Sequence, residues 1–203
     1  AALLRARLFW AYVGVQALGV GTFFMFLTGA PFVAADVFGL NPAQIGIGLG
    51  STTAGFILGA GVSARLVQRV GPMRLILLGR VVPSAGLGGA FAYYAGGGAL
   101  VWPLFLSTVT VGIGNGLSLA NANAGALSVR PDLAGSASGF GGAIVLAVGA
   151  GLSWVTTAVL SGRATADGLL LLMLAILVLA LIAALAAEAW ETSETGVSKP
   201  HTP

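Results

Sequence analysis

The sequence contains no cysteine, and its only histidine, His201, lies near the carboxyl terminus. The absence of cysteine excludes a disulfide framework, a thiol nucleophile and a cysteine-based metal site. The stretch GSASG (135–139) does not form a serine nucleophile elbow, because the position that needs serine is Ala137 and no histidine is near to act as base. HExxH and phosphate-loop motifs are also absent, so we expect no enzyme activity, no ATP-driven transport and no resident cofactor.

Charge is equally scarce, since charged residues make up 7% of the chain against about a quarter in soluble globular proteins. Hydrophobic residues make up 57%, and the mean hydropathy is +0.99. The 32 glycines lie among Leu, Ala, Val and Ile, as they do in packed membrane helices. This composition predicts an integral membrane protein that contacts the lipid bilayer and does not bind nucleic acid.

Six apolar runs are long enough to cross a bilayer, whose hydrocarbon core needs about 20 helical residues. Turn formers and charges separate the runs. The fold class is therefore all-α, a bundle of six transmembrane helices. We expect a cytoplasmic lead-in over 1–8, a transmembrane domain over 9–188 and a disordered cytoplasmic tail over 189–203. The six predicted spans are 9–29, 45–64, 75–95, 99–120, 135–160 and 168–187.

The placement of Arg and Lys predicts how the bundle is oriented. Arg163 stands alone on one side of the predicted bundle, and the other loops and ends hold the remaining basic residues. By the positive-inside rule the basic side is cytoplasmic, so both chain ends face the cytoplasm. Because the chain does not begin with Met, we expect it to be part of a longer protein.

The loop ARLVQRVGPMR (64–74) concentrates three arginines in one turn. Arg65 and Arg69 are spaced i,i+4 at the end of a predicted helix, where the helix dipole favours cations. Gly71-Pro72 then ends that helix sharply, and Arg74 starts the next one. The loop either sets membrane topology only or also braces the inner mouth of the bundle, and the sequence leaves both roles open.

A wider stretch, GVSARLVQRVGPMRLILLG (61–79), resembles the loop signature of the major facilitator superfamily, which joins the second and third helices of each six-helix half. Gln68 stands where that signature often has an acidic residue, which weakens any salt-bridge gate. The matching residues are Gly61, Arg65, Arg69, Gly71 and Arg74.

Two further segments, 27–50 and 130–142, resemble the carboxy-terminal half of the Bcr/CflA group of drug:proton antiporters. In that group a Pro-Phe pair ends the first helix of this half and A-G-[ST]-A-S opens the fifth. The corresponding residues here are Pro31, Phe32, Ala134, Gly135, Ser136, Ala137 and Ser138.

This resemblance implies one half of a twelve-helix antiporter of the plasma (bacterial inner) membrane, whose partner is an amino-terminal six-helix half. Such a protein exports small lipophilic drugs or metabolites by alternating access, is driven by the proton gradient and binds substrate between its halves. The alternatives are a six-helix subunit or anchor without transport activity and a half-size transporter that acts as a dimer.

Polar residues within the spans indicate which helices face inward. The stretch 111–125 carries Asn115, Ser118, Asn121 and Asn123, which are costly to expose to lipid. The resemblance implies that the first and fourth helices line a substrate cavity. Interhelical hydrogen bonds without a ligand would explain the same polar residues. The candidate cavity residues are Gln16, Thr22, Phe23, Phe26, Asn115 and Ser118.

Two other patterns concern packing. The run 169–187 has no glycine and no polar side chain, so we expect the sixth helix to be a scaffold against lipid, with Leu177 facing the acyl chains. Four glycine pairs at i,i+4 spacing allow close helix contact or, in a transporter, sliding surfaces. These pairs are Gly46/Gly50, Gly55/Gly59, Gly112/Gly116 and Gly135/Gly139.

Arg80 is the only charged residue within a predicted span. It lies six residues beyond Arg74, a depth of about 9 Å along a helix, from which its side chain can snorkel to the cytoplasmic interface. We expect snorkelling, and the alternative is an inner-gate cation that faces the cavity and pairs with the other half. Asp36 is expected to be exposed at an outer helix end, so the coupling carboxylate would lie outside this segment.

Overall fold

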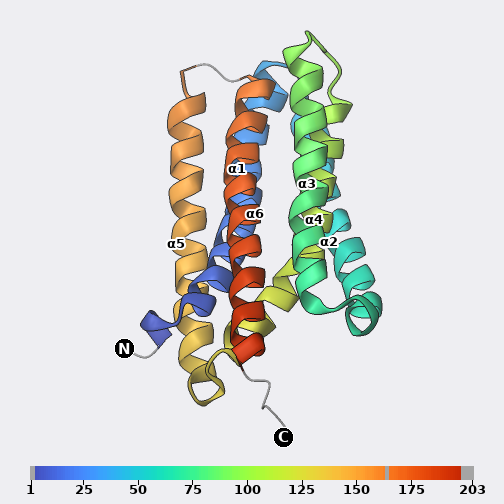
Figure 1. Cartoon of the computed structure of the whole chain (residues 1–203). Coiled ribbons are helices and arrows are strands. Elements are labelled where there is room, and N and C mark those ends of the chain that lie inside the picture. The colour runs from blue at the N-terminus through green and yellow to red at the C-terminus, as the bar shows by residue number, and fades with distance from the viewer. Residues whose placement is uncertain (1–2, 163–164, 198–203) are drawn as a thin grey trace, which may run out of the picture.

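A computed structural model describes residues 3–162 and 165–197, and it consists of helices joined by short turns (Figure 1). Each of its six long helices is long and apolar enough to cross a membrane, which confirms the predicted six-helix bundle. The long helices are α1 (Arg7–Asp36), α2 (Pro42–Val70), α3 (Pro72–Ala95), α4 (Trp102–Ser128), α5 (Ala134–Leu160) and α6 (Ala166–Val197). Two short 3-10 helices, Leu3–Arg5 and Pro131–Leu133, precede α1 and α5.

Local sequence explains most helix boundaries. The Asn41 side chain accepts a hydrogen bond from the Gln44 N–H at 3.0 Å, and the Gln44 side chain accepts one from the Asn41 N–H, so a capping box starts α2. Gly71 alone links α2 to α3, with φ of 89°, a conformation that favours glycine. This confirms the sharp turn that Gly71-Pro72 predicts.

Two predicted boundaries are wrong. Pro31 does not end the first helix, because α1 continues through it to Asp36; a proline inside a membrane helix is tolerated where neighbouring groups and local adjustments satisfy the freed backbone. At the other end of the chain, α6 extends to Val197, well into the tail expected to be disordered. Trp190 packs against a buried cluster there, which holds the polar end of α6 on the bundle.

The helix contacts are symmetric when α1–α3 are exchanged with α4–α6. α1 packs against α5 and α6, and α4 packs in the same way against α2 and α3. α1 and α4 also contact each other, as do α3 and α6. Successive helices run in opposite directions, and three helices precede α4. α1 and α4 therefore run in opposite directions (Figure 1). The bundle is therefore arranged as an inverted repeat of two three-helix units.

The α2–α4 contact depends on glycine. A Cβ added at Gly55 or Gly59 of α2 would overlap the backbone of α4, and one at Gly112 or Gly116 would overlap the backbone of α2. The two predicted pairs on these helices therefore face each other in close packing. The pairs Gly46/Gly50 and Gly135/Gly139 meet no neighbouring atoms, so they play no such role within the described chain.

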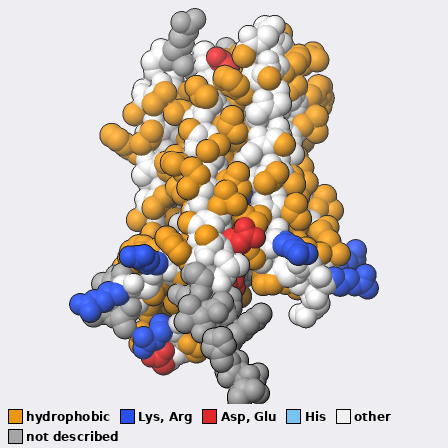
Figure 2. Space-filling view, in the orientation of Figure 1, with side chains coloured by type: hydrophobic (Ala, Val, Ile, Leu, Met, Phe, Trp, Pro, Cys, Tyr) orange, Lys and Arg blue, Asp and Glu red, His pale blue; other side chains and the backbone are white. Residues whose placement is uncertain are grey.

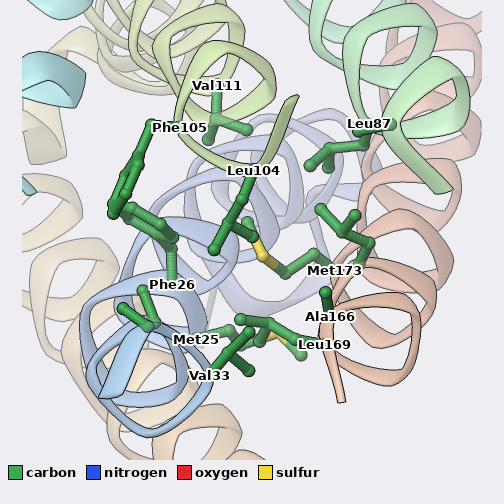
Figure 3. Packing of buried hydrophobic residues seen from close by; sticks show 14 of the residues in the cluster. Met25, Phe26, Val33, Leu87, Leu104, Phe105, Val111, Ala166, Leu169 and Met173 are labelled. Atoms are coloured by element: carbon green, nitrogen blue, oxygen red, sulfur yellow. The ribbon is translucent and has the colours of Figure 1, made fainter. Parts of the chain in front are cut away.

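Two apolar clusters divide the interior of the bundle along its length. The first, shown in Figure 3, contains Met25, Phe26 and Leu104 with Leu169 and Met173 of α6. The second lies nearer the chain termini. It contains Phe9, Tyr12, Ile76, Ala122 and Ala187, among others.

Leu177 belongs to the first cluster and is fully buried, so the expectation that it faces lipid is wrong. α6 packs one face against α1 and α3 and leaves the other face exposed. A helix that is apolar all round gives no sequence signal for which side is buried.

Basic side chains gather at one end of the molecule, the end at which both termini lie (Figures 1 and 2). Arg65, Arg69 and Arg74 are exposed there, at the α2–α3 turn. This one-sided distribution agrees with the charge asymmetry on which the orientation was predicted. Arg163 and Lys199 lie outside the described residues.

Candidate functional site

A layer of polar groups separates the two apolar clusters. It is centred on Arg80 of α3, whose side chain is 1% exposed. The Nη2 atom of Arg80 donates to Oδ1 of Asn115 at 3.1 Å and to Oγ of Ser118, and it lies 3.5 Å from the Gly114 carbonyl. We call Gly19, Arg80, Asn115 and Ser118 the polar layer.

Gly19 of α1 makes room for this arrangement. A Cβ at position 19 would overlap Nη1 and Cζ of Arg80, so only glycine leaves space for the guanidinium against α1. The Gly19 carbonyl also accepts a hydrogen bond from Nδ2 of Asn115 at 3.1 Å. Asn115 thus points its oxygen at the cation and donates to α1, which connects α1, α3 and α4 through one side chain.

The positive charge of Arg80 has no counter-ion among the described residues. Its Nε and Nη1 atoms are buried without hydrogen-bond partners. Every carboxylate whose side chain the structure describes lies outside the polar layer, toward the ends of the helices. These residues are Asp36, Asp132, Asp167, Glu188 and Glu191. A buried, unpaired cation is costly in a membrane, and such residues commonly mark functional sites.

The expectation that Arg80 snorkels to the interface is therefore wrong. Its side chain turns inward to α4 and α1 because Gly19 leaves space and Asn115 and Ser118 offer acceptors. A depth of six residues beyond Arg74 permits snorkelling, but it does not decide which side of α3 faces the bundle. Asp36, by contrast, is exposed at the end of α1, as expected.

A pocket of about 280 Å³ lies between α1, α2 and α4, and Asn115 belongs both to its wall and to the polar layer. Its walls are mostly apolar, with Phe23 and Phe56 as the aromatic residues. Asn115 is the middle residue of the 27 in α4, so the pocket lies near the centre of the membrane span. The lining residues are Val20, Phe23, Thr52, Thr53, Phe56, Gly112, Asn115 and Leu119.

One pocket residue carries an unused hydrogen-bond group. The hydroxyl of Thr52 is buried and has no partner. Most buried hydroxyls in proteins are hydrogen-bonded, so an unpartnered one on a residue that lines a pocket is a candidate for ligand contact. Thr53 and Phe56 are exposed, and the pocket opens to the outside of the bundle beside them.

Two of the six candidate cavity residues, Phe23 and Asn115, line this pocket. Phe26 is fully buried in the first apolar cluster, with its ring edge-on to Phe105, so its assignment to the cavity is wrong. Thr22 donates to the Leu18 carbonyl at 2.9 Å and is buried within the bundle.

The other two candidates also lie outside the pocket wall. Gln16 is partly buried and donates to the Tyr12 carbonyl, while Ser118 binds Arg80. Interhelical hydrogen bonds of the kind named as the alternative are made by Asn121, which donates to Ser63 of α2 at 2.9 Å, and by Asn115, which donates to Gly19 of α1. Asn123 is exposed, so the expectation that it faces inward is not met within this chain.

The α2 wall of the pocket was not predicted from the sequence. Thr52 and Thr53 follow Ser51 in a run of three hydroxyl residues near the middle of the predicted span 45–64, and this run was the signal that could have identified them. Gly19 carried no signal, since glycine is common throughout the chain.

The segments that carry the narrower resemblance lie apart from the pocket. Ala134 is the first residue of α5, so the A-G-S-A-S segment does open the fifth long helix. Pro31 and the exposed Phe32 lie near the carboxyl end of α1, and Gly61 is exposed on α2.

Fold and site together define a multi-pass membrane protein with a central pocket beside a buried cation. No protein family, curated protein or solved structure matched the chain in the comparisons. The resemblance to the major facilitator superfamily stays a prediction that rests on the residues of the α2–α3 loop and the two shorter segments.

Proposed function

We propose that this chain is one six-helix half of a secondary active transporter that exports small lipophilic drugs or metabolites by alternating access. The pocket between α1, α2 and α4 carries the proposal, because it is central in the membrane span and combines aromatic walls with a few polar groups. Pockets of this kind bind small amphipathic molecules. Secondary transporters bind their substrates at the same depth.

The inverted repeat of three-helix units supports the same proposal. Six-helix halves of major facilitator transporters contain nested inverted repeats of three helices. The matching contacts of α1 and α4 with their neighbours follow that pattern. A membrane anchor or an assembly subunit would not need an inverted repeat.

In this proposal a second six-helix half completes the substrate cavity and supplies the carboxylate that couples transport to the proton gradient. The protein lies in the plasma membrane, the inner membrane of a bacterium, with both chain ends in the cytoplasm. The exposed arginines of the α2–α3 turn then hold that loop on the cytoplasmic side.

Everted membrane vesicles from cells that express the full-length protein, with both six-helix halves, provide the test. Respiration acidifies the vesicle lumen and quenches an acridine dye, and solute–proton antiport should partly restore the fluorescence when a lipophilic solute is added. Phe56→Ala should raise the solute concentration for half-maximal recovery by roughly tenfold, because truncating an aromatic anchor commonly costs that much affinity.

Phe32→Ala is the matched control, since Phe32 is 42% exposed and Phe56 39%, and Phe32 lies outside this pocket. It should leave the response unchanged at equal protein abundance. If no solute of a varied panel restores fluorescence although the protein is inserted, the transport proposal fails and a subunit or anchor is favoured. A response that requires two copies of this chain would favour the half-size dimer.

A further inference from the structure

We propose that the central pocket accepts a small amphipathic organic anion, and that Arg80 sets this preference through Asn115. The inference rests on the proposed function, because it names the charge class of the substrate. Arg80 and Thr52 both have buried polar atoms without hydrogen-bond partners. Arg80 binds the Asn115 amide, and Thr52 and Asn115 line the same pocket.

Asn115 connects the buried cation to the pocket. Its Oδ1 accepts from Arg80, and one hydrogen of Nδ2 is donated to the Gly19 carbonyl. A carboxamide nitrogen carries two hydrogens, so one N–H remains beyond the one donated to Gly19, and Asn115 also lines the pocket. Because chains of hydrogen bonds polarise one another, acceptance from a cation makes that N–H a stronger donor.

The pocket supplies a second donor and a matching apolar surface. The Thr52 hydroxyl is buried and unpartnered, and Thr52 is one of the residues that line the pocket. A carboxylate, or another acid group with one negative charge, can accept from both Thr52 and Asn115. Phe23 and Phe56 flank the remaining space, which suits an aromatic or aliphatic body.

Charge decides between classes of ligand. No carboxylate among the described residues forms an ion pair with Arg80, so its field extends toward the pocket at low dielectric. A ligand cation would be repelled there, and a neutral ligand would leave Arg80 uncompensated. An anion instead supplies the missing counter-charge, with Arg80 acting as a positioning residue that does not touch the ligand.

The experiment measures equilibrium binding to the full chain in lipid nanodiscs at neutral pH. Three radiolabelled probes share one ring system: 1-naphthaleneacetate, the neutral 1-naphthaleneacetamide and the cationic 1-naphthylmethylammonium. Empty nanodiscs correct for partition into lipid. The acetate should bind roughly tenfold more tightly than the acetamide, since hydrogen bonds to charged groups are the stronger ones, and the ammonium should bind most weakly.

Two variants test the role of Arg80. Arg80→Met should abolish the preference for acetate over acetamide while acetamide binding stays within about twofold, and Arg80→Lys should restore part of the preference. Asn115→Asp places a carboxylate beside Arg80 within the protein, so it should fold even where Arg80→Met does not, and it should abolish the preference as well. Arg74→Met removes the same charge from an exposed position and should leave the preference unchanged.

The inference is overturned if the three probes bind equally, if the ammonium binds best, if no probe binds above empty nanodiscs, or if the acetate preference survives in Arg80→Met and Asn115→Asp. Equal binding together with solute-driven proton flux in vesicles would remove the anion preference and leave the transport proposal. Anion-selective binding without such flux would keep the anion preference and remove the transport proposal.

Discussion

At the scale of single residues, the position of Arg80 depends on the absence of a side chain at a neighbouring glycine. Gly19 has no side chain where the guanidinium lies, and Asn115 and Ser118 supply the acceptors that orient it. A buried cation without a counter-ion lowers stability, and proteins commonly accept such a cost at functional sites. The polar layer is therefore the part of the interior where stability and function are expected to conflict.

Gly19→Ala tests this arrangement. The added methyl group overlaps Nη1 of Arg80, so the side chain must leave its acceptors or the helices must separate. We expect the free energy of unfolding to fall by about 1–3 kcal/mol, the usual range for overpacking. Thermal unfolding followed by circular dichroism in nanodiscs measures it.

Gly142→Ala is the control, because a Cβ at position 142 of α5 meets no atom within 4 Å. It should leave stability unchanged or raise it by up to about 1 kcal/mol, since alanine is the better helix former. Equal stability of the two variants would show that Gly19 does not determine where Arg80 lies.

At the scale of the helices, α2 is held by small residues. Its buried residues are Gly48, Thr52, Gly55, Gly59 and Ser63, which recur every three or four positions and so form one face. That face packs on the glycines of α4, while the rest of α2 is largely exposed. Close backbone contact therefore replaces large apolar side chains as the source of this packing.

Gly59→Ala should weaken the α2–α4 contact, because a Cβ there overlaps the Ile113 carbonyl and the backbone cannot rotate away as a side chain can. We expect a loss of about 1–3 kcal/mol of unfolding free energy, measured by the same thermal unfolding. Gly50→Ala, on the same helix but in open space, should cost nothing. A result in which both substitutions are harmless would contradict the close contact of α2 and α4.

At the scale of the whole molecule, basic residues mark one end and define a testable orientation. The chain has no native cysteine, so single cysteines report accessibility without background. Gln68→Cys and Ala99→Cys place exposed thiols before and after α3, one in the last turn of α2 and one in the α3–α4 loop. In intact cells an impermeant thiol reagent should label position 99 and not position 68, and permeabilisation should add labelling at 68.

The reporter cysteine in the α3–α4 loop is placed at position 99 and not at the nearby Gly97. Gly97 has φ of 86°, so a cysteine there would be strained. Labelling of both positions in intact cells would contradict the six-helix topology. Labelling of position 68 alone would keep the bundle and invert its orientation.

The sequence by itself determined the number of helices, the α2–α3 turn at Gly71 and the end at which positive charge gathers. These features depend on local causes: the length of each apolar run, the backbone freedom of one glycine and the cost of burying charge. Asn115 could also be identified, since an amide in the middle of a span must find a partner in protein or water.

Only the tertiary structure decided where Arg80 points, which face of α6 is buried and which residues line the pocket. Snorkelling and burial are both open to an arginine at that depth, and the choice depends on Gly19 and Asn115, which lie more than thirty residues away in the chain on two other helices. Phe26 and Phe23 are three residues apart on α1, yet one fills the apolar core and the other lines the pocket. That difference arises from how α1 is rotated against α2 and α4, a property of the packed bundle and not of any one segment.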